Sequence, residues 1–364
     1  MHAAHPHSIQ AYAKVNLLLA VQYPPVGGFH ELRSVFQTVD LADELDFERV
    51  PRGELVEFRG AGAGDAAGGR LAFTEAGSAV VVECEPDVGI ACADNLVFKA
   101  IDAMERACGR TLAGGADEAV RVRVKKRIPA GGGLGGGSSD AAAAIRWCAA
   151  ELGIDACGPA ALGVAGALGS DVACFLYGGA TLMSGRGEHL ERRLPAFPLP
   201  LVLMGDTHGN STPAVYAAFD AGCAAALASS PAASPSPAAA SPAGAPSPAS
   251  ASVPDAEALA SLMERAAVSD AASAAALDAA SPVAPLSLAA ACANNLSEAA
   301  FSCNPALRAR VERAQADPDV LAALVTGSGS TSFAICADET AAQRFAARAA
   351  AYSAWTRPVR AVCA

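Results

Sequence analysis

The chain has 364 residues, and 26 basic against 37 acidic side chains give it a net charge of −11 at pH 7. This length is enough for two domains whose cores need no disulfide staples. An acidic chain is a poor candidate for nonspecific nucleic-acid binding, which relies on cationic patches, so we expect no nucleic-acid partner.

Eleven cysteines are scattered without a C-x-x-C pair or a zinc spacing. This odd number favours reduced thiols in a cytosol over a disulfide framework, and no metal-binding residues are predicted. The first eight residues lack the basic and apolar regions of a signal peptide, and no apolar run suits a membrane span. We therefore expect a cytoplasmic protein without a membrane partner.

An apolar run at residues 11–21 predicts a buried strand. Because side chains alternate along a strand, Tyr12, Lys14 and Asn16 should share one face. A lysine in such a strand is costly unless it has a partner or a task. The chain has only four lysines, so Lys14 is a candidate for chemistry; an edge strand with this lysine in solvent is the alternative.

Residues 119–128 alternate valine or isoleucine with arginine or lysine, which predicts a strand covered on one face. Residues 129–139 then read Pro-Ala-Gly-Gly-Gly-Leu-Gly-Gly-Gly-Ser-Ser and lead into a helical run that ends at Gly153. Ser138 or Ser139 should cap this helix. Glycines at a helix start expose backbone N–H groups, so the junction predicts a phosphate site rather than a flexible linker.

Two common nucleotide-binding motifs match the spacing of the glycine run but not its context. Gly131 and Gly136 have the Walker A spacing, but Gly137 stands where that motif needs lysine, which excludes an ordinary P-loop. A G-x-G-x-x-G dinucleotide motif also fits, with Glu151 near the offset of a ribose-binding acid. Glu151 falls inside the predicted helix rather than after a following strand, so a dehydrogenase is a distant alternative.

Residues 222–285 are rich in alanine, proline and serine, most strongly up to 254. Such a segment cannot offset its ordering entropy, so we expect a disordered insertion with a possible helix at 255–265. A strand and a helix are predicted before it, and a helix and a strand–turn–strand after it, at 199–204, 213–219, 307–316 and 324–336. The insertion should therefore interrupt one domain whose halves meet in space. The glycine turn at 326–332 fits a plain hairpin as well as a ligand loop.

Six motifs, taken in order, resemble those of the GHMP kinases, which are small-molecule kinases. They are Ala13-Lys-Val-Asn-Leu17, Gly28-Phe-His30, Ala93-Asp-Asn-Leu96, Gly133-Leu-Gly-Gly-Gly-Ser-Ser139, Leu168-Gly-Ser-Asp-Val172 and Thr326-Gly-Ser-Gly-Ser330. The resemblance implies an α+β fold of two domains. An ATP-binding domain like ribosomal protein S5 domain 2 would span 8–178, and an α/β-sandwich domain would span 179–364, interrupted at about 222–285.

The resemblance implies transfer of the ATP γ-phosphoryl group to a small alcohol, with Mg2+ bridging phosphate oxygens. The six motifs match most closely those of the branch that phosphorylates the 2-hydroxyl of a cytidylylated methylerythritol in the non-mevalonate isoprenoid pathway. Asp171 would be the general base and Lys14 its partner. An alcohol must give up its proton as the new bond forms, and a lysine can keep the carboxylate ionised. A helix cap is the alternative for Asp171.

The resemblance also implies binding residues. Phe29, His30 and Tyr216 would hold cytosine, and Asn16 would lie near the reacting hydroxyl. Phe29 replaces a common tyrosine, and the motif at 294–296 varies an asparagine–aspartate pair. The nucleotide-binding residues would be Pro129, Ala130, Gly131, Gly132, Gly133, Leu134, Gly135, Gly136, Gly137, Ser138, Ser139, Asn95 and Lys126.

Three other functions stay open on the sequence. The nearest is a GHMP kinase of another alcohol, such as mevalonate or homoserine, which Phe29, His30 and Tyr216 disfavour. The others are a nicotinamide-dependent dehydrogenase and an ATP-binding scaffold without activity.

Overall fold

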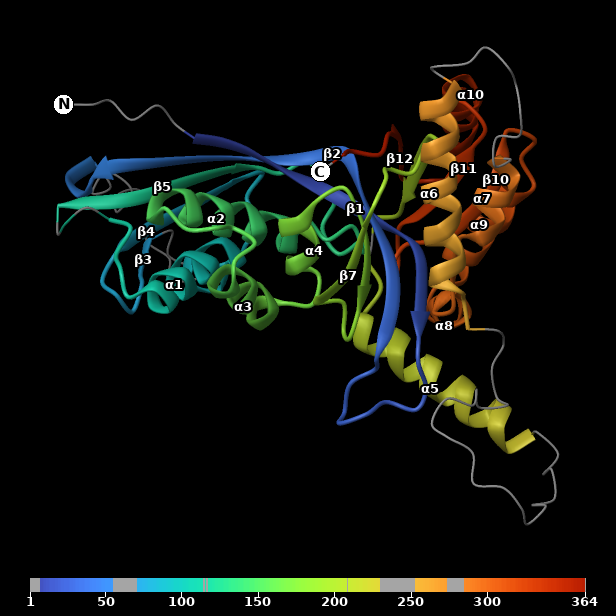
Figure 1. Cartoon of the computed structure of the whole chain (residues 1–364), viewed down its shortest axis with the longest axis horizontal. Helices are drawn as coiled ribbons and strands as arrows, with labels where there is room; N and C mark the ends of the chain where they lie inside the picture. Colours follow the sequence, from blue (N-terminus) through green and yellow to red (C-terminus); the bar gives the residue numbers. More distant parts are fainter. Residues whose placement is uncertain are drawn as a thin grey trace.

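The computed structural model describes residues 7–54, 71–113, 115, 117–207, 209–229, 253–273 and 285–363. These residues form an eight-stranded and a four-stranded sheet, each covered by helices (Figure 1). The expected two-domain α+β fold is therefore confirmed. In the described part of the chain, no helix is both long enough and apolar enough to cross a membrane.

The first sheet is built on two long antiparallel strands, β1 (His7–Val21) and β2 (Leu32–Pro51). Its order is β3-β4-β5-β2-β1-β9, with β6 paired to β2 and β7 to β6. The further strands are β3 (Leu71–Phe73), β4 (Ala79–Glu85), β5 (Glu118–Lys125), β6 (Ala180–Ser184), β7 (His189–Leu194) and β9 (Ala293–Asn294). Most pairs are antiparallel, unlike the parallel sheet of a nicotinamide dehydrogenase, which excludes that alternative.

Because β6 and β7 belong to this sheet, the sheet continues beyond the expected domain boundary at residue 178. One side of the sheet is covered by α1 (Leu96–Cys108), α2 (Gly136–Leu152) and α3 (Pro159–Leu168) (Figure 1). On β5 the valines are buried and the intervening basic residues are more exposed, as their alternation predicts. Trp147 of α2 stacks on Phe47 of β2, with ring centroids 5.0 Å apart.

The second sheet has the order β10-β11-β8-β12 and is antiparallel throughout. Its strands are β8 (Leu201–Gly205), β10 (Val320–Val325), β11 (Ser332–Cys336) and β12 (Trp355–Val359). β8 precedes the alanine-rich segment and its partners follow it, so the two halves meet as predicted. Leu201 and Leu203 face one core, and Val202 and Met204 face another, so both faces of β8 are covered.

Helices cover the two faces of this sheet unequally. One face packs against α5 (Thr212–Ser229), α8 (Ser297–Cys303), α9 (Pro305–Gln315) and α10 (Glu339–Ala349). The opposite face packs against α6 (Ala256–Ser273) and α7 (Pro285–Ala291), in a core that also contains Val15 and Leu17 of β1. The core that contains α6 is therefore shared by the two sheets.

Two described parts of the predicted insertion at 222–285 are helical rather than disordered, and one of them, α6, contains the possible helix expected at 255–265. α5 continues to Ser229, and α6 buries Leu259, Ala260 and Met263. These apolar residues recur at helical spacing and form one buried face despite the alanine-rich composition. The remaining parts of the predicted insertion, 230–252 and 274–284, lie outside the described residues.

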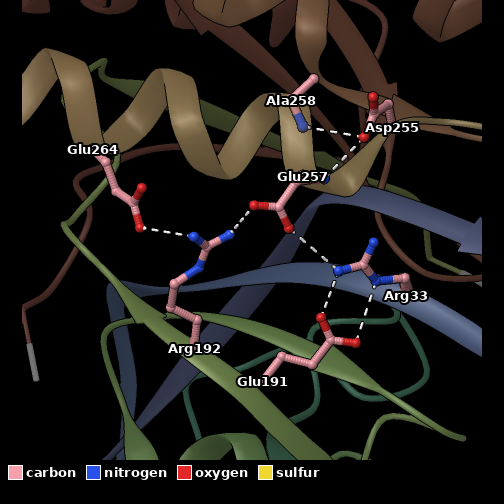
Figure 2. A network of polar contacts seen from close by, with 7 residues as sticks. All are labelled: Arg33, Glu191, Arg192, Asp255, Glu257, Ala258 and Glu264. Atoms are coloured by element: carbon pink, nitrogen blue, oxygen red, sulfur yellow. Dashed lines mark hydrogen bonds and ion pairs between the residues drawn. The ribbon is translucent and has the colours of Figure 1, made fainter.

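Exposed ion pairs join α6 to strands of the first sheet (Figure 2). Glu257 lies 2.5 Å from a guanidinium nitrogen of Arg192 on β7 and 3.5 Å from one of Arg33 on β2. Arg192 also pairs with Glu264 of α6 at 3.4 Å. Arg33 in turn pairs with Glu191 of β7. The network spans three elements, so it fixes the orientation of α6 on the strands.

Candidate active site

A cleft of about 850 Å³ lies where the first sheet meets α5 and the turn after β10. Five of the six sequence motifs contribute residues to its wall, although they are spread from residue 14 to residue 328. These residues are Lys14, Asn16, Gly28, Phe29, His30, Gly133, Gly135, Ser170, Asp171, Gly327 and Ser328. The folded chain therefore brings predicted residues from five separate motifs into one cavity.

Lys14 and Asp171 meet on the wall of this cleft. The Lys14 side chain is only 3% exposed, and its Nζ atom lies 3.5 Å from Asp171 Oδ2 and 2.7 Å from Asn16 Oδ1. Asp171 is 35% exposed and precedes α4 (Val172–Tyr177), but its side chain accepts no capping hydrogen bond from that helix. Lys14 is therefore not a solvent-exposed lysine of an edge strand, and the Asp171 side chain is not a helix cap. The arrangement is a buried ammonium group beside a carboxylate that still reaches the cleft.

Tyr12, which was expected on the same face, lines a different cavity. The pairing of β1 with β2 shifts register between Tyr12 and Ala13, and again between Asn16 and Leu18. Such a β-bulge changes the alternation of side chains along the strand. Lys14 and Asn16 therefore face the cleft without Tyr12.

The helix after the glycine loop starts earlier than expected. α2 begins at Gly136, and its N-cap is Gly135, in the left-handed conformation with φ 75°. Neither serine caps the helix, which corrects that prediction, since the Ser139 hydroxyl donates instead to the Tyr12 carbonyl at 2.7 Å. Gly153 ends the helix with φ 67°, as predicted. The first N–H groups of α2 thus lack a side-chain cap, the arrangement that suits an anion.

The second glycine turn packs directly on the first. The Thr331 N–H donates to the Gly132 carbonyl at 3.1 Å, and the Asn16 N–H donates to Thr326 Oγ1 at 3.1 Å. A Cβ atom on Gly133 would lie 2.7 Å from the Thr326 carbonyl oxygen. These contacts require glycine at this close approach. The turn at 326–332 is therefore part of the cleft wall rather than an isolated hairpin end.

Asn95 and Lys126 are not among the residues that line this cleft. Asn95 caps α1 by accepting from the Val97 N–H at 2.9 Å. Lys126 Nζ lies 2.5 Å from Asp43 Oδ2 and 2.6 Å from Asp140 Oδ2, so it joins β2 to α2 across the glycine loop. Their roles at a nucleotide stay predictions.

One cation serves two carboxylates in this cluster. Asp43 also accepts from the N–H groups of Arg127 and Ile128. Asp140 has one buried oxygen with no hydrogen-bond partner among the residues that the structure describes. Burial, with a further contribution from the Asp43 charge, raises the pKa of Asp140 to about 7 although Lys126 opposes the shift.

Aromatic side chains also line the cleft. His30, from the loop between β1 and β2, lies against Tyr216 of α5 with ring centroids 5.2 Å apart. Phe29 is 59% exposed, and the Arg186 guanidinium lies 5.0 Å from its ring centroid. Burial, helped by the Asp171 charge, raises the pKa of Tyr216 to about 12, so it stays a neutral phenol.

Sequence reasoning missed Arg186 and Asp220, which also line the cleft. Arg186 lies in the turn between β6 and β7, where glycines on both sides were its only signal. Asp220 follows Tyr216 by four residues, so the two share one face of α5. Both reach the site only through tertiary contacts that local sequence does not report.

The fold and the cleft define a two-domain kinase of small molecules. Family models agree: the GHMP kinases N terminal domain matches residues 95–179, and the GHMP kinases C terminal domain matches residues 255–354. A 4-diphosphocytidyl-2-C-methyl-D-erythritol kinase of Pelotomaculum thermopropionicum is 32% identical over 339 residues, covering 93% of this chain and 92% of the relative. One of Salinispora tropica is 31% identical over 356 residues, covering 96% and 89%.

A solved structure extends the similarity to three dimensions. The crystal structure of a 4-(cytidine 5'-diphospho)-2C-methyl-D-erythritol kinase superposes with a TM-score of 0.63 at 25% identity, over 98% of this chain and 100% of the other. The chain belongs to the GHMP kinase family and, within it, to the 4-diphosphocytidyl-2-C-methyl-D-erythritol kinases.

Proposed function

We propose that the protein transfers the γ-phosphoryl group of ATP to the 2-hydroxyl of 4-diphosphocytidyl-2-C-methyl-D-erythritol. One observation carries the proposal: five motifs meet at one cleft, and there Lys14 and Asp171 lie 3.5 Å apart. Relatives that match most of the chain bear this enzyme name. The product would belong to isoprenoid precursor synthesis by the non-mevalonate route.

The Lys14–Asp171 pair supports the chemistry of an alcohol acceptor. Asp171 accepts the hydroxyl proton as the oxygen attacks phosphorus, and the ammonium group of Lys14 lies beside the carboxylate. Asn16 holds Lys14 from the other side, at 2.7 Å. Lys14 also balances the negative charge of the phosphoryl group during its transfer. Binding of the hydroxyl beside this pair therefore supplies both base and electrostatic support.

The glycine loop supports binding of the triphosphate. Gly133 and Gly135 have positive φ and line the cleft, and the uncapped N-terminus of α2 follows at once. Backbone N–H groups of this kind, together with the helix dipole, favour phosphate oxygens. No cluster of three His, Cys, Asp or Glu side chains in the described residues suits a metal ion. Mg2+ that arrives with ATP would then be held chiefly by phosphate oxygens.

The aromatic lining of the cleft favours a nucleotide-linked acceptor over a small alcohol. Phe29, His30 and Tyr216 form an aromatic wall, and such rings stack well on a planar base. Mevalonate and homoserine have no ring to place there. The aromatic wall thus supports the cytidine-containing substrate, with the base against these rings and the hydroxyl at Asp171.

An ADP-release assay tests this function on a panel of alcohols with ATP. The panel contains the cytidylylated methylerythritol, mevalonate and homoserine, each with and without Mg2+. We expect turnover with the cytidylylated substrate alone, and only when Mg2+ is present. Turnover on mevalonate or homoserine instead would contradict the proposed acceptor.

A further inference from the structure

Both ring nitrogens of His30 face protein groups. Nδ1 lies 2.8 Å from the Gln22 carbonyl oxygen, and Nε2 lies 3.1 Å from Asp220 Oδ1. A carbonyl oxygen only accepts hydrogen bonds, so Nδ1 must carry a proton. Nε2 is directed at a carboxylate, which is also an acceptor. In this arrangement His30 presents its ring face to the cleft, and neither nitrogen is free for a substrate base.

Asp220 presents a partly exposed carboxylate to the cleft. Its side chain is 39% exposed and lines the cleft beside Tyr216. Its Oδ1 atom is buried against His30. The exposed remainder of the carboxylate is therefore the part that can accept a hydrogen bond from a ligand.

The other charged group beside the aromatic rings cannot replace Asp220. Arg186 lies over Phe29, and a guanidinium group only donates hydrogen bonds. It therefore suits a phosphate or a base carbonyl, whereas an amino group needs an acceptor. Of Arg186, His30 and Asp220, Asp220 is the side chain that can accept.

We propose that Asp220 reads the base of the substrate, by accepting a hydrogen bond from the exocyclic amino group of cytosine. This inference rests on the proposed function, which places a cytidine against the aromatic wall. Carboxylates accept from this amino group in other cytosine-reading sites. Uracil carries a carbonyl oxygen there, which would face the carboxylate and be repelled. Asp220 thus both attracts cytosine and rejects uracil.

Binding of CDP and UDP to the full-length protein, measured by calorimetry, tests the proposal directly. Wild type should bind CDP at least about tenfold more tightly than UDP, as expected for one good base contact. Asp220→Asn should weaken CDP binding and reduce the preference to about threefold or less, because an amide can donate to the uracil oxygen. Glu298→Gln, on an exposed carboxylate of α8, is the control and should keep the preference.

Three further measurements keep the outcome interpretable. Melting temperature and ATP affinity report whether each variant folds. Asp220→Ser provides a second substitution if Asp220→Asn does not fold. With the cytidylylated substrate, Asp220→Asn should raise KM far more than it lowers kcat. Equal binding of CDP and UDP by wild type, or an unchanged preference in both Asp220 variants, overturns the proposal.

The binding assay also separates this inference from the proposed function. A CDP preference that depends on Asp220 supports the role of Asp220 even if the assay of turnover fails. Conversely, normal turnover of the cytidylylated substrate together with an unchanged preference in the Asp220 variants overturns the role of Asp220 alone.

Discussion

Asp171 connects a buried cation to the open cleft, and this position makes its replacement informative. An amide cannot take the hydroxyl proton, so Asp171→Asn should lower kcat by at least about 100-fold, the usual range for loss of a general base. ATP binding should be kept, because the glycine loop is untouched. Steady-state kinetics and an ATP-binding titration measure the two effects.

The control for this substitution is Asp102→Asn, on a carboxylate of α1 that pairs with Arg106 and does not line the cleft. It should leave kcat within about twofold, because Asp102 does not line the cleft. If Asp171→Asn turns over as fast as this control, Asp171 is not the base.

Residues differ in how far their sequence context reveals them. Lys14 could be singled out because a lysine in an apolar strand contradicts its surroundings, and the structure shows it buried beside Asp171. Asp220 gave no such signal, since an aspartate on a mostly exposed helix is ordinary. Its position depends on how α5 packs beside the loop that carries His30, and that contact joins residues far apart in the sequence.

At the scale of elements, the two glycine turns hold each other in shape. Gly133 has φ 79°, and a Cβ atom there would lie 2.7 Å from the Thr326 carbonyl oxygen. Gly133→Ala should therefore displace the turn at 326–332 and weaken ATP binding by at least about tenfold, as misplaced binding groups do. A nucleotide-binding titration and denaturant unfolding measure the effect.

Gly153→Ala is the matched control. This glycine ends α2 with φ 67°, and nothing lies within 4 Å of an added Cβ atom. The substitution should cost roughly 1–2 kcal/mol of stability from the left-handed backbone alone, and ATP affinity should be unchanged. Equal ATP affinities in the two variants would show that contact between the turns is unimportant for the nucleotide.

Periodicity predicted the strands and helices near the site because buried and exposed residues repeat at one spacing along each element. β5, α9 and the pair β10–β11 lie where the alternation and glycine positions placed them. The start of α2 was missed for a tertiary reason. Gly135 adopts the left-handed conformation, and Ser139, which favours a cap in isolation, donates to β1 instead. Local propensity cannot include a partner from another element.

At the scale of the whole molecule, α6 joins the cores of the two sheets. Leu259 is fully buried there, so Leu259→Ala should lower the free energy of unfolding by about 2–5 kcal/mol. Glu257→Gln alters only the exposed network of Figure 2 and should cost no more than about 1 kcal/mol. Denaturant unfolding compares the variants; a loss below 1 kcal/mol for Leu259→Ala would show that α6 contributes little to the core.

The expected disorder of this segment has a compositional cause. Its alanine, proline and serine content suggested that it buries too little to be ordered, and only a possible helix at 255–265 was expected, but Leu259 and Met263 stand one helical turn apart on a buried face. Two large apolar residues on one face, surrounded by alanines, pack closely against strands because alanine lets the helix approach. The average composition of the segment does not reveal such a face. The two-domain organisation could be predicted because it rests on short local motifs.

The place of β8 in its sheet has a consequence for synthesis of the chain. Both neighbours of β8, the strands β11 and β12, come later in the sequence. A ribosome adding 5–20 residues per second needs roughly 6–25 s to make the intervening stretch of about 130 residues before β11. Throughout that interval β8, with apolar side chains on both faces, has no strand beside it. The first sheet can largely assemble while the second waits, so a nascent chain stalled in this interval is the form in which the protein is most exposed to aggregation.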